Sequence, residues 1–302
     1  MTEDNILDRI RGHISIPRRS RLILGMGDDC AIFRPPGSPD DLLFTTDLLL
    51  ENVHFRRDSH TAADAGHKAL ARGLSDIAAM GGNPMFCLLS LALPERAGQK
   101  WIDEFFAGLL KLASKTGTIL AGGDLAHSER FACDIVVAGS VPKGCALRRD
   151  GARPGEAIYV SGRLGGSALG LRTHRGPAWK RHLRPAPRLA LGRFLRERIH
   201  ASAAMDLSDG LSLDLRRLCL ASNVSAEIEA PPVFSGATLE DALNGGEDYE
   251  LLFTAPPGAR VPAHFESLPL TRIGTIRRGN AGRVTLNGQP LVALGYDHFR
   301  RS

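Results

Sequence analysis

Aromatic residues and long apolar segments are scarce in this sequence. Phe, Trp and Tyr make up only 6% of the 302 residues, and no basic stripe with interleaved aromatics is present. Such stripes are typical of nucleic-acid binding. No apolar run reaches the roughly 18 residues that a membrane span needs, and residues 1–5 lack the basic and apolar regions of a signal peptide. We therefore expect a cytoplasmic protein that binds neither nucleic acid nor membrane.

Paired cysteines are also absent. The five cysteines are scattered and none forms a C-x-x-C pair, which disfavours zinc-ribbon and thioredoxin-like sites and favours reduced thiols. Cys87 and Cys133 lie in apolar runs, so we expect them to be small core residues. Cys30 adjoins an aspartate pair, so a catalytic thiol is an alternative there, although no basic partner lies nearby in the sequence.

Three common nucleotide-binding patterns are missing. The chain has no G-x-x-x-x-G-K-[ST], no G-x-G-x-x-G between a strand and a helix, and no protein-kinase set with H-R-D and D-F-G. The net charge of +5 and the pI near 9.1 permit attraction to anionic ligands without specifying one. Any nucleotide chemistry must rest on other residues.

What the sequence does contain is a series of aspartates in short, turn-like motifs. Each has a Gly, Ser or Thr within two residues, so the backbone can bend close to a ligand and hydroxyl groups can add neutral oxygen donors. Mg²⁺ binds through one or two carboxylates together with water and substrate phosphates. Carboxylates gathered in one cleft would repel each other unless cations lay between them. The aspartates are Asp28, Asp29, Asp47, Asp76, Asp124, Asp206 and Asp209.

The order of the segments predicts two α/β domains with mixed sheets. At about 150 residues per domain, the chain is long enough for two, and the polar segment 148–155, which carries Gly and Pro, is the expected boundary. We therefore assign 1–147 and 148–302 to the two domains, with a loop-rich tail from 277. The predicted strands are 42–46, 87–93, 119–121, 135–141, 157–160, 203–206, 249–254 and 270–276, and the predicted helices are 61–80, 101–113, 164–171, 187–198 and 211–222.

Three of the aspartates are predicted at the ends of these elements. Asp47 ends the strand 42–46, Asp76 lies in the last turns of the helix 61–80, and Asp124 follows the strand 119–121. A carboxylate near a helix C-terminus opposes the helix dipole, so Asp76 either faces solvent or has a cation beside it. An ordinary Asx turn explains any single motif equally well. Five segments with the same chemistry at element ends nevertheless favour a ligand site.

Other motifs leave two interpretations open. His54 is either a structural histidine or a substrate contact that follows the Thr-Thr-Asp strand. Arg149 is either a solvated residue or a clamp for a phosphate. Gly123 lies in a Gly-Gly-Asp turn that could cradle a phosphate. Glu247 belongs either to an ordinary turn or to an acidic contact with a cationic or amino-bearing substrate.

Taken together and in order, eight motifs resemble those of thiamine-monophosphate kinase, from about residue 25 to residue 299. The motifs are Gly-Met-Gly-Asp-Asp-Cys-Ala (25–31), Thr-Thr-Asp with Asn-Val-His-Phe (45–55), Leu-Ser-Asp-Ile-Ala-Ala-Met-Gly-Gly-Asn-Pro (74–84), Gly-Gly-Asp (122–124), Lys-Arg-His-Leu-Arg-Pro (180–185), Asp-Leu-Ser-Asp-Gly-Leu (206–211), Gly-Gly-Glu-Asp-Tyr-Glu-Leu (245–251) and Gly-Tyr-Asp-His-Phe (295–299).

The resemblance implies the two-domain fold of aminoimidazole ribonucleotide synthetase, with the N-terminal sheet at a homodimer interface. It implies ATP-dependent phosphorylation of thiamine monophosphate to thiamine diphosphate, with ATP as co-substrate and several Mg²⁺ ions as cofactors. By position, the implied magnesium ligands are Asp29, Thr45, Thr46, Asp47, Asp76, Asp124, Asp206 and Asp209. The implied ATP contacts are Gly123, Asp124, Arg149 and Ser208, and the implied contacts to the thiamine part are His54 and Glu247.

One position departs from the family pattern. Members of the family carry a substrate-contacting aromatic residue two positions before the glycine of Gly-Tyr-Asp-His-Phe, and this chain has Ala293 there. The contact is either missing or supplied by another side chain such as Tyr296. A non-catalytic nucleotide- or thiamine-phosphate-binding protein is therefore an alternative, as is a sibling synthetase of the same fold. Selenophosphate synthetase is disfavoured because residues 1–24 contain neither Cys nor Lys.

The implied acceptor also predicts a mechanism. A phosphate monoester has its second pKa near 6, so its attacking oxygen is mostly deprotonated at neutral pH. No general base or nucleophilic side chain is then required. We expect direct in-line transfer in which metal ions lower the repulsion between the two phosphates.

Overall fold

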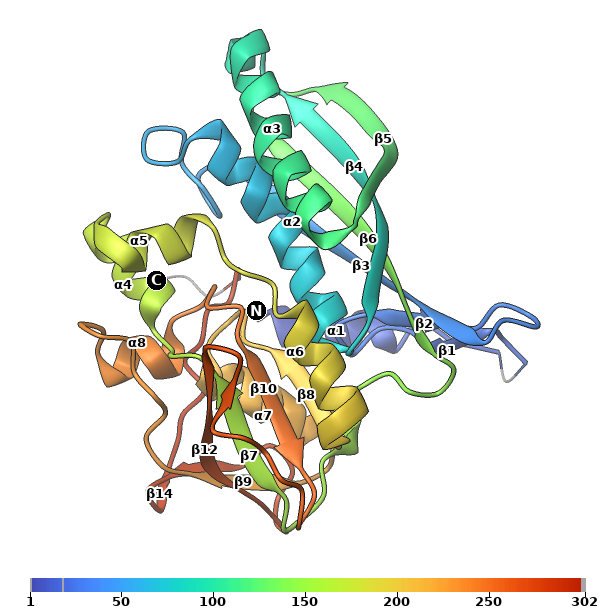
Figure 1. Cartoon of the computed structure of the whole chain (residues 1–302), viewed down its shortest axis with the longest axis vertical. Coiled ribbons are helices and arrows are strands. Elements are labelled where there is room, and N and C mark those ends of the chain that lie inside the picture. Colours follow the sequence, from blue (N-terminus) through green and yellow to red (C-terminus); the bar gives the residue numbers. More distant parts are fainter. Residues whose placement is uncertain (1, 18, 300–302) are drawn as a thin grey trace.

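The computed structural model describes residues 2–17 and 19–299 and contains two α/β domains, one above the other in Figure 1. The expected fold class, α/β with mixed sheets in two domains, is confirmed. None of the helices in the described ranges is both long and apolar enough to span a membrane.

The N-terminal sheet has six strands in the order β1-β2-β3-β6-β4-β5. All neighbouring strands are antiparallel except β4 and β5, which are parallel. Helices α2 (Ala62–Ala79) and α3 (Gly98–Thr116) cover one face of this sheet and share an aliphatic core with it (Figure 1). The strands are β1 (Leu22–Leu24), β2 (Ala31–Phe33), β3 (Asp40–Leu50), β4 (Asn83–Leu93), β5 (Ile119–His127) and β6 (Ala132–Pro142), and a 3-10 turn, η1 (Glu95–Ala97), precedes α3.

The C-terminal sheet follows the order β14-β13-β9-β12-β7-β10-β8, with β11 paired to β12. Helix α7 packs on one of its faces, and α6 with the π-helical turn η3 (Leu195–Ile199) packs on the other, so two separate apolar cores flank the sheet. The strands are β7 (Ala157–Ser161), β8 (Ala203–Asp206), β9 (Ser225–Ile228), β10 (Leu251–Ala255), β11 (His264–Phe265), β12 (Leu268–Arg277), β13 (Val284–Leu286) and β14 (Gln289–Pro290). The helices are η2 (Arg149–Gly151), α4 (Gly166–Thr173), α5 (Gly176–Leu183), α6 (Leu189–Phe194), α7 (Leu211–Ala221) and α8 (Leu239–Asn244).

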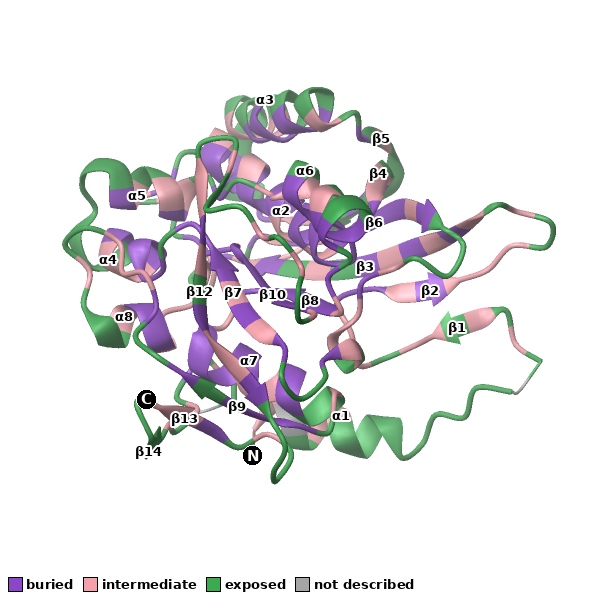
Figure 2. Ribbon diagram, turned by 60° about the horizontal axis from the view of Figure 1, so that its bottom comes forward, coloured by how far each residue is buried: buried purple, intermediate pink, exposed green. Residues whose placement is uncertain are grey.

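Helix α2 is the element that joins the two domains, and most of its residues are buried (Figure 2). It begins as predicted, because Thr61 and Asp64 form a reciprocal capping box, and it ends where Gly81 adopts a φ of +67°. On one side Gly66 lies so close to α3 that a Cβ atom would be 1.9 Å from the carbonyl oxygen of Phe105. On the other side Gly192 of α6 approaches α2 equally closely. A helix buried all round in this way can carry site residues into the interior.

Two predicted strand ends are wrong. Strand β3 continues through Asp47 to Leu50 because it pairs with β6 along its whole length. Strand β5 likewise continues through Asp124 to His127, paired with β4. Glycine is unfavourable in strands, which is why the sequence predicted a turn at 122–124. The structure nevertheless requires a glycine at position 123, since a Cβ atom there would lie 1.8 Å from the carbonyl oxygen of Leu89.

The N-terminal helix α1 (Glu3–Arg11) was not predicted, and it lies against the C-terminal domain rather than against the N-terminal sheet. Its first residue, Glu3, donates its backbone N–H to Asp297 and pairs with Arg217 at 3.9 Å. The predicted helix 187–198 consists of α6 followed by η3, and the tail from 277 contains β13 and β14.

Candidate active site between the two domains

Three of the predicted magnesium ligands converge where the domains meet. Carboxylate oxygens of Asp29, Asp76 and Asp206 lie within 4.8 Å of one another. Asp29 follows β1, Asp76 lies in the last turn of α2, and Asp206 ends β8. The three residues, named here the carboxylate cluster, are far apart in sequence and are brought together by the position of α2 between the two sheets.

Asp29 and Asp206 are buried, Asp76 is half-buried, and the carboxylate cluster is short of positive charge. Burial and the charge of Asp29 raise the pKa of Asp206 to about 8, although Ser75 donates a hydrogen bond to it at 2.6 Å. Burial, Asp47 and Asp206 raise the pKa of Asp76 well above its usual range, and Thr45 donates a hydrogen bond to this carboxylate. One oxygen of Asp29 is buried without a hydrogen-bond partner. Such a set of hard oxygen donors fits a divalent cation.

Arg149 is the cation nearest to this cluster. Its guanidinium pairs with Asp29 and lies 3.7 Å from Asp28. Its backbone N–H also donates to Asp28 at 3.1 Å. Burial and the charge of Asp29 raise the pKa of Asp28 to about 7. Asp28 therefore holds the Arg149 segment in place beside the cluster.

The Thr-Thr-Asp motif is divided between the two faces of β3, because successive side chains of a strand point to opposite sides. Thr45 and Asp47 face α2, where Asp47 forms an ion pair with Arg72 at 3.1 Å. Thr46 points to the other face and donates to Asp134 at 2.6 Å. The side chain of Thr46 is thus separated from the carboxylate cluster.

Asp124 also lies away from the cluster. The strand register places Leu48, Asp134, Ser90 and Asp124 in one row across β3, β6, β4 and β5. This row lies on the face that α2 and α3 leave uncovered. Asp124 is exposed there, and its carboxylate accepts a hydrogen bond from the backbone of the next residue at 2.9 Å.

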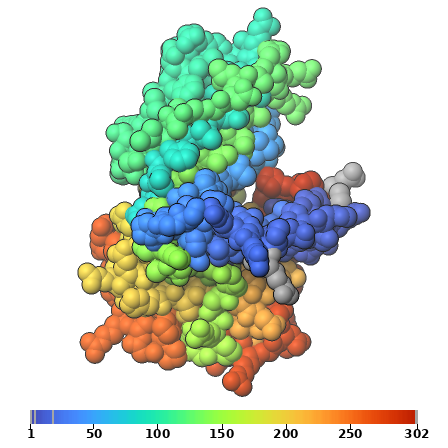
Figure 3. All heavy atoms as spheres, turned by 90° about the vertical axis from the view of Figure 1, so that its right-hand side faces the viewer, coloured from blue at the N-terminus to red at the C-terminus, as the bar shows by residue number. Residues whose placement is uncertain are grey.

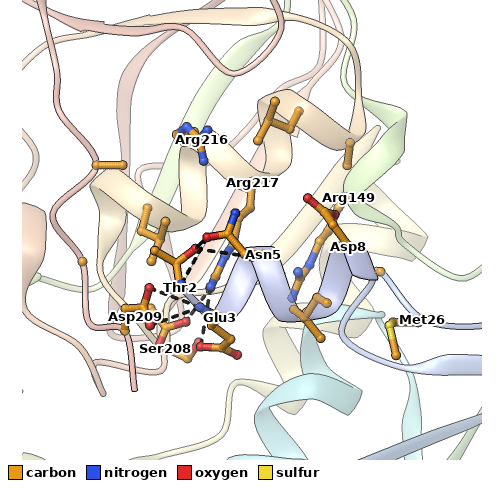
Figure 4. A pocket seen from close by; sticks show the side chains of 18 of the residues that line it. Thr2, Glu3, Asn5, Asp8, Met26, Arg149, Ser208, Asp209, Arg216 and Arg217 are labelled. Carbon is orange, nitrogen blue, oxygen red and sulfur yellow. Dashed lines mark hydrogen bonds and ion pairs between the residues drawn. The ribbon is translucent and has the colours of Figure 1, made fainter. Parts of the chain in front are cut away.

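A cavity of about 1030 Å³ adjoins the cluster on the side of the C-terminal domain. Arg149, Ser208 and Asp209 line it, so the structure brings two predicted ATP contacts together with a predicted magnesium ligand. Asp209 is paired with Arg217 of α7. Figure 4 shows helix α1 alongside this cavity, with Thr2, Glu3 and Asn5 next to Asp209 and Arg217.

Sequence reasoning missed two contributions to this cavity. Helix α1 supplies part of the wall, including Arg11, and α7 supplies Arg216 and Arg217. The basic residues of the predicted helix 211–222 could have been noticed, because they follow the Asp-Leu-Ser-Asp-Gly motif by two helical turns. Nothing in the sequence indicated that α1 would reach the C-terminal domain. Ala293 also lines this cavity.

Two of the three predicted substrate contacts, Glu247 and Tyr296, lie next to the Ser208–Asp209 segment, and His54 is linked to Tyr296 through the ring of His298. The backbone N–H of Glu247 donates to Ser208 at 2.7 Å, and that of Tyr296 donates to Asp209 at 2.8 Å. The ring of His298, which the sequence did not single out, packs edge-on against His54 at 5.1 Å and against Tyr296 at 4.8 Å.

His54 and Glu247 offer complementary hydrogen-bonding groups. His54 accepts a hydrogen bond at Nδ1 from the backbone of Leu50 at 3.0 Å. Burial and the charge of Arg72 lower the pKa of His54 to about 3, so the ring is neutral at pH 7 and carries its proton on Nε2. That N–H is buried without a partner. Burial by itself would raise the pKa of Glu247, but the positive charge of Lys68 outweighs this effect and lowers the pKa to about 2, so Glu247 is an ionised acceptor at pH 7.

A catalytic thiol at Cys30 is disfavoured. Burial and the carboxylates of Asp76 and Asp29 raise the pKa of this thiol well above its usual value. A protonated, fully buried thiol is a poor nucleophile.

Comparison with known proteins gives two matching domain families. The family described as AIR synthase related protein, N-terminal domain, matches residues 27–141, and the corresponding C-terminal domain family matches residues 153–287. The thiamine-monophosphate kinase of Salmonella typhimurium is 39% identical, over 93% of this chain and 94% of the relative. That of Bacillus subtilis is 34% identical, over 95% and 98%.

Solved structures agree with these relatives. A structure described as AaThiL complexed with AMPPCP and TMP has a TM-score of 0.86 and 32% identity, covering 99% of this chain and 97% of that one. The thiamine-monophosphate kinase of Stenotrophomonas maltophilia has a TM-score of 0.77 and 38% identity, covering 95% and 97%. The chain belongs to the thiamine-monophosphate kinase family.

Proposed function

We propose that this protein transfers the terminal phosphoryl group of ATP to thiamine monophosphate, forming thiamine diphosphate and ADP. The observation that carries the proposal is the position of the carboxylate cluster. Asp29 of the cluster is paired with Arg149, which lines the cavity suited to a nucleotide, and the Ser208–Asp209 wall of that cavity accepts hydrogen bonds from the backbone of Glu247 and Tyr296. The family relatives and the AMPPCP and TMP complex of a similar protein support this assignment.

The hydrogen-bonding groups fit the thiamine part of the acceptor. An aminopyrimidine offers a ring nitrogen as acceptor beside an amine as donor. His54 supplies the complementary N–H, and Glu247 supplies the complementary carboxylate. The negative charge of Glu247 also suits the cationic thiazolium ring. Tyr296, supported by His298, is the aromatic surface that takes the place of the family residue replaced by Ala293.

The charges fit direct in-line transfer. Asp29, Asp76 and Asp206 would hold Mg²⁺, with Thr45 and Asp47 beside Asp76. Mg²⁺ would supply the positive charge that offsets the repulsion between the two phosphates. The guanidinium of Arg149, now paired with Asp29, lines the cavity and could contact a nucleotide phosphate there instead. No side chain needs to act as base, because the acceptor oxygen is mostly deprotonated at pH 7.

We further propose that the protein is a homodimer formed through the uncovered face of the N-terminal sheet. Leu48 and Leu88 are exposed on this face, and Leu125 of the edge strand β5 is 70% exposed. Figure 3 views the molecule from this side, with strands β4 to β6 in the upper, teal and green half. Large apolar side chains exposed on a sheet face and at its edge are typical of a protein interface. Asp124 lies on this face, so Asp124 would serve as a ligand in the partner's site.

The test is to incubate the protein with ATP, Mg²⁺ and thiamine monophosphate and to measure thiamine diphosphate by chromatography. We expect product with one ADP released for each thiamine diphosphate, and no radiolabelled phosphoprotein. If ATP binds but no thiamine diphosphate forms, the protein is a non-catalytic binder or uses another acceptor, and the proposal is wrong. Trapping a phosphoenzyme would exclude direct transfer only.

A further inference from the structure

The side chain of Lys68 is the one fully buried lysine among the described residues, and it lies between the two domains. Lys68 belongs to the second turn of α2 and is 0% exposed. Its ammonium lies 2.8 Å from one oxygen of Glu247 and 2.9 Å from the other, and 3.0 Å from the backbone carbonyl oxygen of His54. A buried ammonium is costly unless it is paired and hydrogen-bonded, and here its partners come from both domains.

Both partners of this ammonium are residues that the proposed function places on the aminopyrimidine. His54 lies in the turn after β3, and Glu247 lies in the turn before β10. Glu247 has a left-handed backbone with φ of +64°, a strained conformation for a residue other than glycine. Both carboxylate oxygens contact the Lys68 ammonium, and the side chain is 23% exposed, so it remains partly open to a ligand.

The other neighbour of the Glu247 carboxylate, His182, does not hold it by charge as Lys68 does. His182 lies 3.4 Å from the Glu247 carboxylate, but its Nδ1 also contacts the hydroxyl group of Ser167 at 2.9 Å. Burial and the charge of Lys68 lower the pKa of His182 to about 3, so this ring adds no positive charge at pH 7. Among the described residues, Lys68 is the cationic side chain that contacts Glu247 directly, and Arg72 adds a more distant positive charge.

The geometry points to Lys68 as a positioning residue for the acceptor substrate. By holding the Glu247 carboxylate and the His54 turn on one ammonium, it sets the spacing between the carboxylate acceptor and the N–H donor that bind the aminopyrimidine. This inference rests on the proposed function. It predicts that removing the charge of Lys68 changes the KM for thiamine monophosphate and leaves the KM for ATP nearly unchanged.

The first test compares Lys68→Met with the wild-type protein in the thiamine diphosphate assay. We expect the KM for thiamine monophosphate to rise at least about tenfold, because one partner of a buried charge pair is removed, while the KM for ATP changes less than about twofold. Lys111→Met, on the exposed side of α3, is the matched control and should change neither constant. Equal increases in both KM values would mean that Lys68 only stabilises the domain interface, which would overturn the inference.

The second test is a double-mutant cycle with Glu247→Gln. If Lys68 acts through Glu247, the increase in the KM for thiamine monophosphate in the double variant should be clearly smaller than the product of the two single increases, with any remaining effect of Lys68 acting through the His54 turn. Multiplying effects would show that Lys68 acts elsewhere and would contradict the inference. Should Lys68→Met fail to fold, Lys68→Gln takes its place, since it can still donate to the His54 carbonyl group. A wild-type protein that makes no thiamine diphosphate refutes the proposed function instead, so the two failures are distinguishable.

Discussion

Glu250 and the carboxylate cluster differ in how many positive charges compensate their negative charge. Glu250, at the start of β10, is fully buried and is bound by Arg181 at 2.6 Å, by Arg188 and by the hydroxyl group of Ser161. In the carboxylate cluster Asp29 and Asp206 are buried and Asp76 is half-buried, yet among the described residues a cationic side chain pairs with Asp29 only. Asp76 and Asp206 accept hydrogen bonds from the hydroxyl groups of Thr45 and Ser75.

This difference separates a structural acid from a functional one. A buried carboxylate that contributes only to the fold is saturated by arginines, as Glu250 is. The carboxylate cluster keeps unsatisfied oxygens and strong mutual repulsion, which is unfavourable until a cation binds. Buried acids with raised pKa values beside a cavity are typical of functional sites.

Removing one member of the carboxylate cluster should have the largest effect on activity. We expect Asp206→Asn to lower the rate of thiamine diphosphate formation about a thousandfold, equivalent to about 4 kcal/mol of lost transition-state stabilisation. Without added metal its melting temperature should be unchanged or higher, because a repulsive charge is gone. Asp103→Asn, on the exposed face of α3, is the control. Retained activity in Asp206→Asn would exclude the cluster as the metal site.

Replacing Glu250 should lower the stability of the fold and should have little effect on catalysis. Glu250→Gln leaves Arg181 and Arg188 without their common partner, so we expect it to lower the free energy of unfolding by about 3 kcal/mol. The folded fraction should retain most of its activity. Glu227→Gln breaks an exposed ion pair with Arg277 and should cost less than about 1 kcal/mol. Urea unfolding followed by circular dichroism measures both, and equal costs would contradict the contrast drawn between the two groups.

Asp124 extends the comparison, because it is a predicted ligand that lies outside the carboxylate cluster. If it serves the partner's site, mixing the inactive variants Asp124→Asn and Asp206→Asn under dimer exchange should restore about a quarter of the wild-type activity. Half of the randomly formed dimers are then mixed, and each of these has one intact site. If Asp124 serves its own chain, no mixed dimer has an intact site and activity stays absent.

The smallest expected effect is a pH dependence of stability in the metal-free protein. The pKa of Asp206 is raised by burial and by Asp29 from 3.8 to about 8. The folded state therefore binds more protons than the unfolded state between these values, and stability falls as pH rises from about 4 to 8. We expect a lower melting temperature at pH 8 than at pH 5 in EDTA, and a smaller difference with Mg²⁺. A difference that Mg²⁺ leaves unchanged would place the metal elsewhere.

Much of the site could be predicted from the sequence because its signals are local. The capping box of Thr61 and Asp64 fixes the start of α2, so it also fixes the turn of the helix that carries Asp76. The order of the aspartate motifs identified the family. Short-range patterns of this kind depend only on neighbouring residues, which the sequence displays directly.

The remaining features depend on contacts between distant segments. Strand β3 pairs with β6 along its whole length, and β5 pairs with β4 in the same way. As a result Asp47 and Asp124 lie inside strands and not at strand ends, on opposite faces of the sheet. The pairing of Lys68 with Glu247, across 179 positions of sequence, could not be inferred from either motif alone. Residue types and their local spacing thus determined the donors and the chemistry of this protein. Strand register and the burial of α2 between two sheets decided which donors meet, because these follow from long-range packing.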